Sequence, residues 1–96
     1  MKKVINGKRY DTDKMTELCS KPAYNNGNYA GATHLMVSDK GNFAIFRSSN
    51  GQDCWRTESI QPLDGVDEVI DAIEGWTFTD DEMQKLEKHG VIIPEA

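Results

Sequence analysis

The chain has 96 residues, of which 38% are hydrophobic and 28% are charged, and its formal net charge at pH 7 is −5. These proportions are ordinary for a globular protein and exclude wholesale disorder. The length predicts a single domain, residues 1–96, with little core to spare for a deep catalytic cavity.

No stretch is apolar for long enough to span a bilayer, which needs about 20 residues. Met1-Lys2-Lys3 has the charge of a signal-peptide start, but residues 6–9 interrupt any apolar segment behind it. We therefore expect a protein that stays in the cytosol where it is made, with no membrane partner. In that reducing compartment, Cys19 and Cys54 are expected to be free thiols.

The first segment, residues 4–10, predicts a β-hairpin, because Asn6-Gly7 accepts the positive φ angles of a type I′ turn. A loop is expected at residues 23–32. Tyr24 and Tyr29 lie in it among asparagines and glycines, a mixture typical of recognition loops, although a plain surface connector has the same composition.

Between the hairpin and this loop, residues 12–20 predict a short helix. Met15, Leu18 and Cys19 stand at i, i+3 and i+4, as on one face of a helix. Thr12 can act as the N-cap, and a proline at position 22 ends the segment.

Three strands of an antiparallel meander are expected next, at residues 33–38, 42–48 and 53–60. A turn at Lys40-Gly41 would place Leu35 opposite Phe46, and a turn at Asn50-Gly51 would place Phe46 opposite Trp55. This register predicts one apolar face and one mixed face. The apolar face would carry Leu35, Val37, Ala44, Phe46 and Trp55. The mixed face would carry His34, Met36, Phe43, Ile45, Arg47, Arg56 and Glu58.

Two helices complete the predicted α+β domain: N-terminal β-hairpin and short helix, three-stranded antiparallel meander, two C-terminal helices. The first is expected at residues 65–74. The second begins at a capping box formed by Thr79 and Glu82. Gly90 is a natural residue to end it, with Val91 packing back in a Schellman motif.

Negative charge is concentrated in the C-terminal part of the chain. Residues 1–56 contain 9 Lys/Arg and 5 Asp/Glu, whereas residues 57–96 contain 2 Lys/Arg and 11 Asp/Glu. Five carboxylates fall on one side of the first C-terminal helix, opposite its apolar side: Asp64, Asp67, Glu68, Asp71 and Glu74. Asp80 and Asp81 extend this stripe or simply favour the start of the next helix.

The spacing of these carboxylates is about one charge per 3 Å of helix axis. One strand of a DNA duplex carries about one phosphate per 3.4 Å. The stripe is therefore either an ordinary solvated surface or a mimic of nucleic-acid phosphates that occupies a basic groove. A basic N-terminal segment could touch nucleic acid directly, but the acidic part would repel a duplex, and we expect no direct nucleic-acid binding.

No catalytic, metal-binding or cofactor-binding motif is expected. The cysteines and histidines have none of the close spacings of zinc ligands. His34 would lie near Arg47, Arg56 and Glu58, as an ion-pair ladder or a small anion site. His34 with Cys54 is a weak nucleophile–base candidate, because no orienting carboxylate is indicated. We therefore expect a protein that is not an enzyme.

Three short motifs give a resemblance to small accessory proteins that are carried by phages and plasmids, mainly of Firmicutes. They are an I-N-G-K-x-Y-D-T opening at residues 5–12, Lys40-Gly41-Asn42-Phe43, and Ile60-Gln61-Pro62-Leu63 before an acidic helix. The resemblance covers most of the chain but not residues 22–32. That pool includes anti-CRISPR proteins, many of them small, acidic and non-enzymatic.

The resemblance implies a non-enzymatic inhibitor of a host nucleic-acid defence enzyme. Its partner would be a basic host protein, most naturally a CRISPR effector, and the carboxylate stripe would be the contact, with Tyr24 and Tyr29 as secondary anchors. The alternative is a small homo-oligomeric interaction module of a mobile element, such as a homodimer joined through the mixed sheet face.

Overall fold

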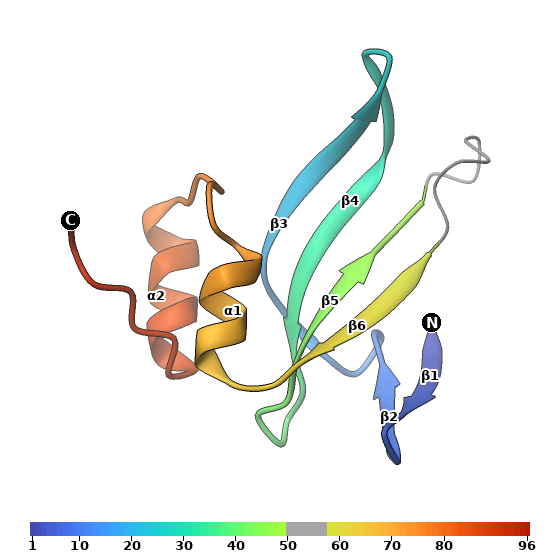
Figure 1. Cartoon of the computed structure of the whole chain (residues 1–96), viewed down its shortest axis with the longest axis horizontal. Coiled ribbons are helices and arrows are strands. Elements are labelled where there is room, and N and C mark those ends of the chain that lie inside the picture. The colour runs from blue at the N-terminus through green and yellow to red at the C-terminus, as the bar shows by residue number, and fades with distance from the viewer. Residues whose placement is uncertain (50–57) are drawn as a thin grey trace.

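A computed structural model describes residues 1–49 and 58–96 and has the expected α+β composition (Figure 1). No helix in these two ranges is long and apolar enough to cross a bilayer. The elements in chain order are β1 (Lys2–Ile5), β2 (Lys8–Asp11), β3 (Thr16–Asn25), β4 (Asn28–Val37), β5 (Phe43–Arg47), β6 (Ser59–Leu63), α1 (Val66–Ala72) and α2 (Asp80–Lys88).

The N-terminal hairpin is confirmed. Strands β1 and β2 pair antiparallel with Ile5 opposite Lys8, which leaves Asn6-Gly7 as a two-residue turn. Both turn residues have positive φ angles, 54° at Asn6 and 76° at Gly7. These are the backbone angles that a type I′ turn requires.

The helix predicted at residues 12–20 is wrong, because the chain from Thr16 onward is strand β3. The cause is a β-bulge: Glu17 pairs with Met36 and Cys19 pairs with Leu35, so Leu18 is an extra residue. A bulge lets two consecutive side chains share one face of a sheet. Leu18 and Cys19 are both buried in the main core. Two adjacent apolar residues depart from the alternation of a simple strand, so the sequence pattern resembled one face of a helix.

The loop predicted at residues 23–32 is also wrong. Strands β3 and β4 continue through it and meet at a two-residue Asn26-Gly27 turn. The φ angles of 51° and 82° repeat the type I′ geometry of the first hairpin. Pro22 lies inside β3, where it is tolerated because β3 is an edge strand of the sheet.

The four-stranded sheet has the antiparallel order β3-β4-β5-β6, which is roughly the expected meander with one more strand. Its register differs by one residue from the prediction: Leu35 pairs with Ile45, and Phe46 pairs with His34. The connection is a three-residue loop in which Gly41 has a φ angle of 82° and donates a backbone hydrogen bond to the Ser38 carbonyl oxygen. A one-residue slip reverses the faces of a strand.

The expected faces therefore change on β5. Phe43 and Ile45 join Leu35 and Val37 in the main core, whereas Ala44 and Phe46 lie on the opposite face. The predicted turn at Asn50-Gly51 and the predicted sheet positions of Cys54, Trp55 and Arg56 lie outside the described residues. Phe46 pairs with Ile60 of β6, so its predicted pairing with Trp55 is wrong.

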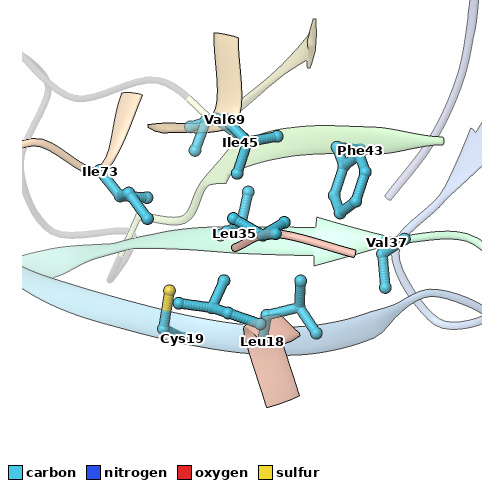
Figure 2. Close-up of a cluster of buried hydrophobic side chains, with 10 residues drawn as sticks. Leu18, Cys19, Leu35, Val37, Phe43, Ile45, Val69 and Ile73 are labelled. Atoms are coloured by element: carbon cyan, nitrogen blue, oxygen red, sulfur yellow. The ribbon is translucent and has the colours of Figure 1, made fainter. Parts of the chain in front are cut away.

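Both faces of the sheet are covered, as Figure 1 shows, with the helices and the N-terminal hairpin on opposite sides. The helix side holds the main core, in which Leu18, Leu35, Val69, Leu86 and Val91 are each at most 1% exposed. Figure 2 shows Leu18 and Cys19 projecting together from β3 into this cluster. On the hairpin side, Tyr10, Ala44 and Ile60 form a smaller cluster.

Both C-terminal helices are confirmed, with α1 shorter than predicted. The Thr79 side chain accepts a hydrogen bond from the Glu82 backbone, and the Glu82 carboxylate accepts one from the Thr79 backbone, as in a capping box. At the other end of α2, Gly90 donates to the Glu87 carbonyl and Val91 donates to the Leu86 carbonyl. These two bonds define a Schellman motif, with Gly90 at a φ angle of 88°.

Gly31 is the position where a side chain should be tolerated least. A Cβ atom there would lie 2.1 Å from the Ser48 carbonyl oxygen, and its φ angle is 134°. We predict that Gly31→Ala lowers the free energy of unfolding by about 3 kcal/mol or more, measured by urea denaturation.

Gly27→Ala is the matched control, because Gly27 also has a positive φ angle but nothing lies within 4 Å of its Cβ position. It should cost only about 1 kcal/mol. Equal losses in the two variants would contradict the close approach of Ser48 to Gly31.

Candidate partner-binding face

Three of the five carboxylates predicted as a stripe, Asp67, Glu68 and Asp71, lie on α1, while Asp64 precedes the helix and Glu74 follows it. Val69 is fully buried and Ile73 is 3% exposed, so this side of the helix faces the sheet. The opposite side faces solvent. Asp64, Asp67, Glu68, Asp71 and Glu74 are all exposed, and together we call them the acidic face.

The acidic face is not neutralised by the basic side chains of the described part of the chain. Within residues 1–49 and 58–96, Glu17 with His34 is the only ion pair, and no lysine or arginine lies within 4.0 Å of these five carboxylates. One of the five has an internal role: Glu68 accepts a hydrogen bond from the Asp64 backbone N–H at the start of α1.

A groove of about 510 Å³ separates the beginning of the acidic face from the N-terminal hairpin. Lys8 lines it on one side, and Asp64 and Glu68 line it on the other. The Lys8 ammonium donates instead to the Asn42 side-chain oxygen at 3.2 Å. Lys8 thus lines the same groove as Asp64 and Glu68 without forming an ion pair with either, whereas Asp67 does not line this groove.

Asp80 and Asp81 are exposed and occupy the first turn of α2, together with Glu82. Negative charge is favoured there by the helix dipole, and Lys85 and Lys88 occupy the last turn, where positive charge is favoured. The two aspartates therefore have a sufficient local role in helix α2. A part in partner binding stays a prediction for both.

Tyr24 and Tyr29 are 60% and 52% exposed at the end of the β3–β4 hairpin. Their rings make an edge-to-face contact with centroids 6.2 Å apart. Figure 1 shows this end projecting from the sheet, far from both helices. The structure therefore places the two tyrosines apart from the acidic face, and their part in partner binding stays a prediction.

The predicted group of His34 with Arg47, Arg56 and Glu58 is not formed as expected. His34 pairs with Phe46 while Arg47 pairs with Thr33, so the side chains of His34 and Arg47 lie on opposite faces of the sheet. Arg47 donates a hydrogen bond to the Gln61 side chain instead. Arg56 and the proposed nucleophile Cys54 lie outside the described residues.

His34 instead joins two residues that sequence reasoning missed. Its Nδ1 contacts the Glu17 carboxylate, its Nε2 lies 3.1 Å from the Ser48 Oγ, and its ring stacks on Phe46. Ser48 Oγ also accepts from the Ala32 backbone N–H and donates to its carbonyl oxygen. The network links β3, β4 and the end of β5. No sequence signal could have found Glu17, because the bulge after it sets its register.

The Cys19 thiol is 3% exposed beneath the helices. Burial, with smaller contributions from the Glu82 and Glu17 carboxylates, raises the pKa of Cys19 from 9.0 to about 12. A thiolate is the reactive form of cysteine, so burial and the raised pKa both disfavour Cys19 as a nucleophile. Among the described residues, no group of three or more Asp, Glu, His or Cys side chains is placed to hold a metal ion.

Comparisons of the chain with protein-family models, with curated proteins and with solved structures find no match.

The pKa of Cys19 predicts a loss of stability at alkaline pH. An unfolded thiol ionises near pH 9, while the folded one keeps its proton to about pH 12, so the unfolded state is favoured as the pH rises through this window. Between pH 8 and pH 10, urea denaturation should show a loss of unfolding free energy about 1 kcal/mol larger for the native protein than for Cys19→Ala. Identical pH dependence in the two proteins would contradict a buried, protonated thiol.

Proposed function

We propose that the protein is a phage- or mobile-element-encoded inhibitor of a host nucleic-acid defence enzyme, most naturally a CRISPR effector. It binds without catalysis. The acidic face occupies a basic groove of the enzyme that otherwise holds nucleic-acid phosphates. The observation that carries this proposal is a run of exposed carboxylates that no lysine or arginine of the described residues neutralises.

The arrangement of charge in the fold supports this orientation. Residues 64–88 contain 9 Asp/Glu and 2 Lys/Arg and include both helices, on one side of the sheet. Lys2, Lys3, Lys8 and Arg9 belong to the hairpin on the other side. A protein divided in this way is attracted with its helix side forward to a positive surface. Such attraction raises the association rate and is weakened by salt.

The resemblance to mobile-element proteins supports the choice of partner. The residues that carry it lie in β1 and β2, in the β4–β5 connection and in β6 before α1. Three of them, Asn6, Gly7 and Gly41, set turns of the scaffold through positive φ angles. The motifs thus describe the fold on which the acidic face is displayed.

Reversing charge on the acidic face should abolish inhibition. We choose Asp67→Lys with Asp71→Lys, because both side chains are exposed and neither makes a described hydrogen bond. The measurement is DNA cleavage by purified CRISPR effectors with guide RNA, titrated with the protein. For an effector that the native protein inhibits, the inhibitory concentration should rise at least about tenfold, since close charge pairs at interfaces are worth about 1.5 kcal/mol or more.

The matched control is Asp13→Lys with Asp39→Lys, which changes the net charge by the same amount. Both side chains are exposed, one after β2 and the other in the β4–β5 connection, and neither belongs to the acidic face. This variant should inhibit like the native protein. Inhibition that survives reversal at positions 67 and 71 would rule out the acidic face as the contact.

The alternative of a homo-oligomeric interaction module can be separated by sedimentation at low and high salt. We predict a monomer in both conditions for the inhibitor. A dimer that is insensitive to salt would favour the module, although Phe43 and Ile45 of the expected mixed face are in the core and cannot form its interface.

A further inference from the structure

We propose that the acidic face contains a receptor for a single arginine side chain of its basic partner, in an apolar pocket at the end of α1. This inference rests on the proposed function and specifies the chemistry of the contact. The pocket has a volume of about 450 Å³ and is lined by Ile70, Trp76, Phe78 and Ile93, with Asp71 and Glu74 among its lining residues. Pockets that bind small ligands have volumes of about 300–1,000 Å³.

The walls of the pocket are aromatic and incompletely covered. The rings of Trp76 and Phe78 stack with centroids 6.5 Å apart and an interplanar angle of 27°. Both side chains are half-buried, packed against the main core on one side. A cation placed within about 6 Å of such a ring is attracted by its electron-rich face.

Backbone geometry places the aromatic walls next to the carboxylates. Helix α1 ends at Ala72, and Gly75 then turns the chain with a φ angle of 82°. Trp76 is held to the helix end by a hydrogen bond from its backbone N–H to the Ile73 carbonyl oxygen. Trp76 thereby lines the same pocket as Asp71 and Glu74, the last carboxylates of the acidic face.

Charge and shape together select the occupant. Asp71 and Glu74 are exposed and form no ion pair with a described lysine or arginine. An apolar side chain would not pair with the carboxylates of Asp71 and Glu74. A compact ammonium group would not fill the apolar part of the pocket. An arginine side chain matches both, because its aliphatic stem packs on Ile70 and its planar guanidinium stacks on an aromatic ring and pairs with a carboxylate.

The test compares arginine with lysine at equal charge. Fluorescein-labelled hexa-arginine and hexa-lysine peptides are titrated with the protein, and binding is followed by fluorescence anisotropy. The native protein should bind hexa-arginine about fivefold more tightly than hexa-lysine, the size expected of one partly exposed cation–π contact. Trp76→Leu should remove this preference while still binding both peptides through the remaining carboxylates.

Two further variants make the result specific. Trp76→Phe keeps an aromatic wall and should keep the preference for arginine, which separates the ring from a general loss of packing. Asp67→Lys, which leaves the pocket intact, should weaken both peptides by the same factor. Thermal unfolding of each variant verifies that it is folded.

Equal affinity for the two peptides in the native protein would overturn the inference, as would a preference that persists in Trp76→Leu. Dimerisation abolished by Trp76→Leu would also overturn it, by assigning the pocket to a second copy of the chain. The outcome is separable from that of the proposed function. If the protein prefers arginine but inhibits no effector, the arginine pocket is supported and the inhibitor function is rejected. If it inhibits an effector but shows no preference for arginine, only the arginine pocket is rejected.

Discussion

The alternation of side chains along β5 determines how the rest of the molecule is arranged. Phe43 and Ile45 point to one side of the sheet, and Ala44 and Phe46 point to the other. All four are apolar, so neither face of the sheet can be left to water. The two helices cover the first face and the N-terminal hairpin covers part of the second (Figure 1).

This two-sided covering has an electrostatic consequence. The helices on one face are acidic and the hairpin on the other face is basic, and the sheet lies between these opposite charges. Acidic residues lie on α1 and α2, whereas the lysines and arginine of β1 and β2 belong to the hairpin on the opposite side of the sheet. Of the basic residues of the hairpin, Lys8 lines the groove that Asp64 and Glu68 also line. The fold thereby prevents the neutralisation that the composition would otherwise allow, and leaves the carboxylates at the far end of α1 unpaired among the described residues.

Local rules predicted those elements that depend on local chemistry. The Thr79–Glu82 capping box, the Gly90 helix end and the Asn6-Gly7 turn were all read correctly, because each is defined by a few adjacent residues. Features that depend on residues distant in the sequence were predicted wrongly. The bulge at Leu18 is fixed by pairing with β4, and the one-residue register change follows from a three-residue loop that sequence alone does not distinguish from a two-residue one.

The same division applies to the candidate site. Helical periodicity alone places the carboxylates of α1 on its outer side, so the acidic face could be predicted. The pocket beside it could not, since it needs Ile93 from the C-terminal segment and the turn at Gly75 that brings Trp76 back to the helix end. Negative charge alone makes a surface attractive to any cation and gives little specificity. On the function proposed above, an aromatic pocket at the edge of that charge would convert a general attraction into a preference for one side chain, and such a preference would let an inhibitor select one basic groove among many.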